Sequence, residues 1–142
     1  MNDLAVDALD RLVADLGDIP VVTEQKVVRR RSRDFFWYSP ILNAQLDGKS
    51  ADLIVLPRNE DDVIRVASIC ARHRVPVTVR GGGTGNYGQA VPLQGGVLLE
   101  ISGLESIEWL KPGVVRAGAG AKMNAIDAAT QAEGWELRLH PS

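Results

Sequence analysis

A glycine-rich stretch that follows a short apolar run constrains this chain more than any other feature. Residues 77–88 read V-T-V-R-G-G-G-T-G-N-Y-G, and five of the eight residues from Gly81 to Gly88 are glycine. Glycine loses more backbone entropy on folding than any other residue, but it permits positive φ and close approach of the backbone to a ligand. Successive backbone N–H groups form a concavity that binds anions. The stretch therefore predicts a phosphate-binding loop, with an ordinary mobile surface loop as the alternative. Its candidate binding residues are Arg80, Gly81, Gly82, Gly83, Thr84, Gly85, Asn86 and Gly88.

Two common phosphate-binding loops do not fit this stretch. Gly83, Gly85 and Gly88 match G-x-G-x-x-G, but a dinucleotide loop of that kind opens directly into a helix. Here residues 89–96 read Q-A-V-P-L-Q-G-G, which lacks helical periodicity and contains a proline. A nucleoside-triphosphate loop requires Gly-Lys-Ser/Thr at its end, and this chain has none there. The phosphate-binding loop therefore belongs to another architecture.

The elements that precede the loop predict a parallel strand–helix–strand unit. Residues 51–56 are almost continuously apolar, as in a strand that is buried on both faces, and Pro57 ends the run. Asn59 is the predicted N-cap of a helix that reaches about residue 73. A right-handed crossover would bring a second strand, residues 77–80, parallel to the first. Ligands bind at the carboxyl ends of parallel strands, which is where the glycine-rich stretch lies. The inner face of the helix is predicted to comprise Val63, Val66, Ala67 and Cys70.

The fold class predicted for the whole chain is α+β, with an α/β-like first part. Residues 97–101 form a further strand, and residues 107–110 and 114–117 form two strands around a Pro-Gly turn. A helix follows at residues 122–133 and ends at Gly134, with Met123, Ile126, Ala129 and Ala132 on its inner face. Two regions are expected: a helix (residues 4–16) with an extended segment over residues 1–50, and the main domain over residues 51–142.

The extended segment contains R-R-R-S-R at residues 29–33, followed by F-F-W-Y at residues 35–38. Basic residues beside aromatic ones resemble a platform for single-stranded nucleic acid. However, the net charge of the chain is −2, and no basic stripe recurs elsewhere. The favoured interpretation is that the arginines form a solvated face and that the aromatic side chains pin the segment onto the main body.

Composition restricts the remaining classes of function. No apolar run approaches the roughly 20 residues that a membrane helix needs, and no basic segment followed by an apolar one indicates a secretory signal. Cys70 is the only cysteine, so the chain cannot form an internal disulfide. Its side chain is expected in the core. His73 has no partner at a metal-ligand spacing, so no metal site is expected. A cytoplasmic protein is the expectation.

Several stretches together resemble a known family. They are residues 54–57 (IVLP), 60–63 (EDDV), 76–85 (PVTVRGGGTG), 95–99 (GGVLL), 101–104 (ISGL), 115–118 (VRAG) and 140–142 (HPS). The chain resembles the N-terminal part of the FAD-binding domain of the vanillyl-alcohol oxidase / p-cresol methylhydroxylase superfamily. Within it, the chain is most similar to FAD-linked oxidases of the glycolate-oxidase-subunit and D-lactate-dehydrogenase type.

The resemblance implies a specific cofactor and a set of contacts. Backbone N–H groups of residues 81–85 would bind the pyrophosphate of FAD, Pro57 would lie near the adenine, and Pro141 and Ser142 would open the next flavin-contacting turn. Many relatives carry a histidine, bonded covalently to the flavin, at the position of Thr84. Non-covalent FAD is therefore expected here. The implied activity is the oxidation of a small 2-hydroxy acid or alcohol by hydride transfer.

The resemblance also implies that the chain is a fragment of a longer enzyme. The second glycine-rich segment and the substrate-binding domain of the family would follow Ser142, so no catalytic residue is assigned. The chain alone is expected to be inactive. The alternative is a non-catalytic fragment that binds nucleotide weakly or not at all. Faces left uncovered on the helix at residues 122–133 and on a strand ending at residue 139 would favour self-association.

Overall fold

The computed structural model describes residues 3–138, with side-chain surroundings from residue 8 onward. The helices are α1 (Asp3–Leu16), α2 (Gln25–Arg31), α3 (Pro40–Leu46), α4 (Glu60–His73) and α5 (Met123–Gln131), with a 3-10 turn η1 (Phe36–Tyr38). The strands are β1 (Val21–Val22), β2 (Leu53–Val55), β3 (Val77–Arg80), β4 (Val97–Glu100), β5 (Ile107–Lys111) and β6 (Val114–Ala117).

The main sheet has the strand order β1-β2-β4-β3. Strands β2 and β3 both run parallel to β4, and β1 is antiparallel to β2. The predicted parallel direction of β2 and β3 is therefore confirmed, but the two strands are not neighbours because β4 lies between them. Burial explains this order: every residue of β4 is buried, whereas Val77 and Val79 of β3 are exposed. The two fully buried strands, β2 and β4, take the inner positions, and the partly exposed β3 takes an edge.

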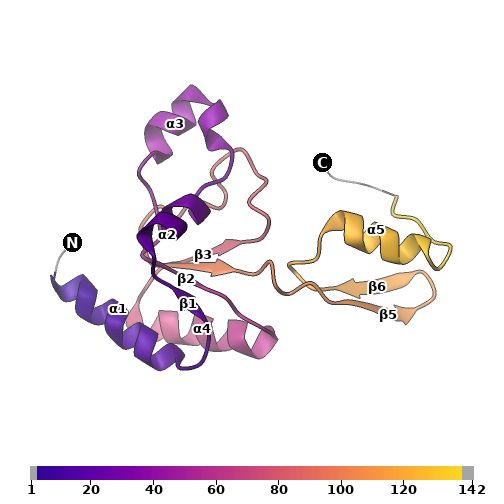
Figure 1. Ribbon diagram of the computed structural model, residues 1–142, viewed down its shortest axis with the longest axis horizontal. Coiled ribbons are helices and arrows are strands. Elements are labelled where there is room, and N and C mark those ends of the chain that lie inside the picture. Colours follow the sequence, from indigo (N-terminus) through magenta and orange to yellow (C-terminus); the bar gives the residue numbers. More distant parts are fainter. Residues whose placement is uncertain (1–2, 139–142) are drawn as a thin grey trace.

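Helices cover both faces of this sheet (Figure 1). On one face, α1 and α4 pack against Leu53, Val55, Val97 and Leu99. On the other face, Val28 of α2 packs against Ile54 and Leu98. Side chains of a strand point alternately to opposite faces, so the continuous apolar runs in β2 and β4 supply both cores.

Helix α4 begins and ends where local signals predict. The Asn59 side chain accepts a hydrogen bond from the Asp62 backbone N–H at 2.8 Å, as an N-cap does. Val66 and Cys70 are buried as predicted, but Ala67 is exposed and Ile69 takes its place in the core. The burial of Cys70 confirms it as a core residue, and this burial raises the pKa of its thiol.

The region between α1 and β2 is not the extended segment that the sequence predicted. It contains β1, α2, η1 and α3, and α1 and β1 join the same core and sheet as the rest of the chain. Local capping accounts for α3, because the Ser39 side chain accepts a hydrogen bond from the Leu42 backbone N–H and Pro40 occupies the first turn. The buried Val28 docks α2 on the sheet.

Strands β5 and β6 form an antiparallel hairpin that, with α5, lies beside the main sheet (Figure 1). Gly113 in the predicted turn has φ +76°, and Gly134 has φ +78° after α5. Ile126 and Ala129 are half-buried, whereas Met123 and Ala132, both predicted to face inward, are exposed. Of the helices within residues 3–138, every one is too short or too polar to cross a lipid bilayer.

Candidate functional site

The glycine-rich loop lies at the carboxyl edge of the main sheet. It follows Arg80, the last residue of β3, and β4 ends alongside at Glu100. Pro57 comes two residues after β2, which is separated from β3 by β4, and its side chain is buried. Parallel strands thus bring three of the segments that the sequence singled out to one edge, where ligands bind in open α/β sheets.

Two glycines of the loop are required by the fold itself. Gly83 has φ +64°, and a Cβ there would overlap the guanidinium of Arg80. Gly88 has φ +81°, and a Cβ there would overlap Leu46 of α3. A Cβ on Gly85 would lie 2.6 Å from Gln89 Oε1, but this oxygen ends a flexible side chain and Gly85 has no positive φ, so the fold does not require glycine there. Backbone conformation and packing therefore account for Gly83 and Gly88 without any ligand.

Gly81 and Gly82 have no such internal explanation. Neither has a positive φ; a Cβ on Gly81 would meet nothing within 4 Å, and one on Gly82 would meet only Thr84 Cγ2, at 3.5 Å. The backbone N–H groups of residues 81–85 donate no hydrogen bond to any residue in the described range. The fold does not require glycine at these two positions, and the backbone N–H groups are available to a ligand. An anion that approaches the backbone closely needs both features, so the loop fits a phosphate.

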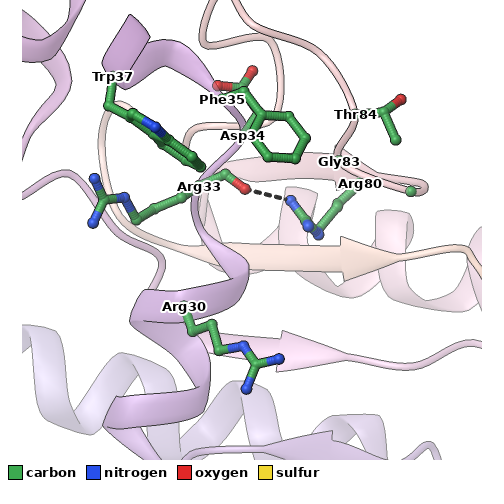
Figure 2. Close-up of a pocket in the computed structure, with 9 residues that line it drawn as sticks. Arg30, Arg33, Asp34, Phe35, Trp37, Arg80, Gly83 and Thr84 are labelled. Carbon is green, nitrogen blue, oxygen red and sulfur yellow. Dashed lines mark hydrogen bonds between the residues drawn. The ribbon is translucent and has the colours of Figure 1, made fainter. Parts of the chain in front are cut away.

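The loop borders a cavity of about 810 Å³ whose other wall comes from the N-terminal region (Figure 2). From the loop side it is lined by Arg80, Gly82, Gly83 and Thr84, and from the other side by Arg30, Arg33, Asp34, Phe35 and Trp37. Sequence analysis missed this second wall. The signal was the run of arginines and aromatic residues at residues 29–38. The arginines were assigned to a solvated face, and the aromatic side chains were expected to pin the segment onto the main body.

Two hydrogen bonds join the second wall to the loop. The Phe35 backbone N–H donates to the carbonyl oxygen of Gly85 at 2.8 Å. Arg80 Nη1 donates to the carbonyl oxygen of Arg33 at 2.7 Å (Figure 2). Ser32 anchors the same segment to the sheet, because its buried hydroxyl accepts from the Ala51 N–H at 3.0 Å and donates to the Val28 carbonyl. The wall is therefore built into the fold.

Arg80 lies behind the loop. Its side chain is 8% exposed, and its Nε is 3.7 Å from Glu100 Oε2, too far for a hydrogen bond. The buried Glu100 also pairs with Arg31 at 3.4 Å and accepts from the Ser102 hydroxyl at 2.8 Å. Burial lowers the pKa of the Arg80 guanidinium, and the Glu100 carboxylate opposes that effect. The guanidinium thus supports Gly83 from below and places positive charge under the loop.

The other predicted site residues differ in their position relative to the cavity. Thr84 and Asn86 are exposed, and Thr84 lines the cavity. Pro141 and Ser142 lie outside the described residues. Within residues 3–138, no group of three or more His, Cys, Asp or Glu side chains is arranged to hold a metal ion.

Comparison with known proteins gives consistent matches. A family model described as "FAD binding domain" matches residues 51–142. Glycolate oxidase subunit GlcD of Escherichia coli (strain K12) is 40% identical over 77 residues, which cover 51% of this chain and 15% of that protein. D-lactate dehydrogenase of Archaeoglobus fulgidus is 31% identical over 90 residues, which cover 63% of this chain and 20% of that protein.

A solved structure of p-cresol methylhydroxylase with substrate bound has the same fold. It superposes with a TM-score of 0.70 at 22% identity, over 94% of this chain and 26% of that chain. This chain therefore spans a fifth or less of the length of the two relatives above, and about a quarter of the solved structure. The family match, the relatives and the architecture agree: the chain belongs to the FAD-binding domain family of FAD-linked oxidoreductases and has the p-cresol methylhydroxylase type of fold.

Proposed function

We propose that residues 81–85 bind the pyrophosphate of FAD through their backbone N–H groups. The observation that carries the proposal is the pair Gly81 and Gly82, which the fold does not require to be glycine and whose N–H groups have no partner in the described chain. A pyrophosphate needs several donors directed at one region, and the loop offers them at the carboxyl edge of a parallel sheet. Thr84 adds a hydroxyl beside them. Pro57, Pro141 and Ser142 are further contacts proposed from the family resemblance, and Asn86 and Gly88 are further contacts proposed from the glycine-rich stretch.

Each residue of the site has a distinct task in this proposal. Gly81 and Gly82 let the phosphates approach the backbone, and Gly83 makes room for Arg80 underneath. Arg80 holds the loop against the Arg33 carbonyl and adds positive charge. FAD, when bound, supplies a hydride acceptor, which no amino-acid side chain provides. This chain supplies binding and orientation, and we assign no catalytic residue to it.

The reaction we propose for the enzyme containing this domain is the oxidation of a small 2-hydroxy acid or alcohol by hydride transfer. The relatives named glycolate oxidase subunit and D-lactate dehydrogenase support that substrate class. Because the chain spans only 15–20% of their length, substrate-positioning residues would belong to segments beyond it. The alternative is that this chain by itself is a non-catalytic fragment that binds nucleotide weakly or not at all.

We propose that FAD is held non-covalently. By the family resemblance, Thr84 stands where many relatives carry a flavin-linked histidine; Thr84 lines the cavity, and its side chain has no nucleophilic nitrogen. Acid precipitation of an FAD-loaded sample distinguishes non-covalent from covalent attachment. Non-covalent FAD is expected in the supernatant, and a yellow pellet would contradict the proposal.

Cofactor retention tests the central proposal. The purified chain is incubated with FAD and desalted, and absorbance between about 350 and 500 nm is recorded. Wild-type protein is expected to retain a flavin band that Gly82→Ala loses. Gly103→Ala is a matched control, since Gly103 also has no positive φ and open space around its Cβ but lies outside the loop. Wild-type protein that retains nothing would support the alternative of a non-binding fragment.

We also propose that the chain self-associates at high concentration. We further propose that it is located in the cytoplasm and that it does not bind nucleic acid. Leu110 of the β5–β6 hairpin is 48% exposed, Trp135 after α5 is 47% exposed, and Met123 of α5 is also exposed. Apolar side chains exposed in the same part of the fold favour association. Light scattering across a concentration series is expected to show a rising mass, and a constant monomer mass would contradict this.

A further inference from the structure

The cationic side chains around the cavity differ in what they already contact. Arg31 pairs with the buried Glu100 at 3.4 Å. The Arg33 guanidinium lies over the rings of Phe36 and Trp37, 5.3 and 5.5 Å from their centroids. Arg80 donates to the Arg33 carbonyl beneath the loop. Each of these three cations is engaged in holding the protein together.

Arg30 is the exception among the arginines that line the cavity. It is exposed, it lines the same cavity as Gly82 and Gly83, and its side chain makes no hydrogen bond or ion pair with any residue from 3 to 138. Figure 2 shows its side chain extending from α2, apart from the Arg33–Arg80 hydrogen bond. A guanidinium has five N–H donors in a fork that matches phosphate oxygens. An unengaged guanidinium therefore shares a cavity with unengaged backbone N–H groups.

We infer that Arg30 is a phosphate-binding residue, supplied by the N-terminal region to the diphosphate held at residues 81–85. This inference rests on the proposed function of the loop. Backbone N–H groups carry partial charges only, so a dianionic diphosphate gains from a full counter-charge on the open side of the cavity. Arg80 provides charge from below, and Arg30 provides it from the opposite wall.

Asp34 adds a buried carboxylate to the same wall as Arg30. Its Oδ1 accepts from the Phe36 N–H at 3.0 Å, and its Oδ2, which is closed to solvent, has no hydrogen-bond partner in the described chain. A carboxylate beside the cavity repels an anion, so a cation on the open side of the cavity is needed to offset it.

The test is calorimetric titration of the 142-residue chain with ADP, adenosine and inorganic pyrophosphate. Wild-type protein is expected to bind ADP, whose diphosphate the loop would hold. Arg30→Gln is expected to raise the Kd for ADP by about threefold to tenfold, the effect of losing one exposed charge-assisted contact, and to leave the Kd for adenosine unchanged. Arg29→Gln is the matched control: the neighbouring arginine undergoes the same charge change but lines a separate cavity of about 400 Å³. Arg30→Lys, which keeps the charge, is expected to recover part of the affinity.

The outcomes separate this inference from the proposed function. If Gly82→Ala weakens ADP binding while Arg30→Gln behaves as Arg29→Gln does, the loop function stands and the Arg30 inference is overturned. Equal losses for ADP and adenosine in Arg30→Gln would also overturn it, because a phosphate contact acts on ADP alone. If Arg30→Gln weakens ADP binding and Gly82→Ala does not, the loop assignment fails, and with it the inference that Arg30 serves a diphosphate held at residues 81–85; Arg30 would then contact phosphate at another site. Wild-type protein that binds no ADP would overturn both.

Discussion

Gly82→Ala is expected to stabilise the protein and to weaken cofactor binding at the same time. A Cβ on Gly82 would meet only Thr84 Cγ2, at 3.5 Å, which is ordinary van der Waals contact, and the backbone has no positive φ. The native conformation therefore accepts alanine. The added methyl group would project into open space beside the N–H groups proposed to bind the pyrophosphate. The same methyl group is thus expected to raise the stability of the fold and to lower the affinity for the cofactor.

The two magnitudes can be worked out separately. Replacing a compatible glycine by alanine reduces the entropy of the unfolded chain and stabilises by about 0.4–1 kcal/mol, or about 1–4 °C in Tm. Loss of one hydrogen bond to a charged phosphate costs about 1.5–3 kcal/mol, which is about tenfold to a hundredfold in Kd. A ligand at 100 times its Kd stabilises the wild type by about 2.7 kcal/mol. FAD is therefore expected to reverse the order of stability of the two proteins.

Thermal melts with and without FAD measure both effects in one assay. Without FAD, Gly82→Ala is expected to melt above the wild type; with saturating FAD, the wild type is expected to melt above Gly82→Ala. Gly103→Ala should show the same small gain in Tm and keep the full shift with FAD, because its Cβ also meets nothing within 4 Å. Gly83→Ala should be destabilised in both conditions, since its φ is +64° and its Cβ would overlap Arg80.

One result would refute the reasoning directly. If Gly82→Ala binds FAD as the wild type does, Gly82 is not needed for ligand approach and the anion site lies elsewhere. A loss of Tm in the variant without FAD would refute the structural premise instead, because it would show that the fold itself requires glycine at this position.

Three further predictions concern the scaffold of the site. Arg80→Met removes a partner of the buried Glu100 and is expected to lower the free energy of unfolding in urea by about 3 kcal/mol. Arg116→Gln breaks the exposed Arg116–Glu108 pair and should cost less than about 1 kcal/mol. Equal losses would contradict a structural role for Arg80. Arg58 and Arg65 lower the pKa of Asp18 to about 2, so the contribution of Asp18 to stability is full above the ordinary carboxyl pKa and is lost as the pH falls through 2. In acid unfolding, Asp18→Asn should therefore lose less stability than the wild type between these two pH values. Identical profiles would exclude the contribution. Cys70 is buried with a raised pKa, so a thiol reagent is expected to react slowly in native conditions and rapidly in denaturant, and fast native labelling would show that the α4 face opens.

Local signals in the sequence were sufficient for the elements that carry the loop. The apolar run before Pro57, the Asn59 cap and the strand before Gly81 each depend on neighbours within a few residues, and β2, α4 and β3 form there. The glycines were also informative, since few functions other than ligand approach explain Gly81 and Gly82. Ala67 was misplaced because helical periodicity defines a face only to within about one residue, and tertiary packing selected Ile69.

Long-range pairing decided what the sequence left open. The position of β4 between β2 and β3 depends on which strand buries best on both faces, a comparison between segments about 20 to 40 residues apart. The second wall of the site depends on contacts such as Phe35 with Gly85 and Arg33 with Arg80, separated by about 50 residues. By itself, the sequence determined the loop and the strands that position it. Only the tertiary structure brought Arg30, Asp34 and Trp37 to face it, because no local pattern encodes which distant segment packs against a loop.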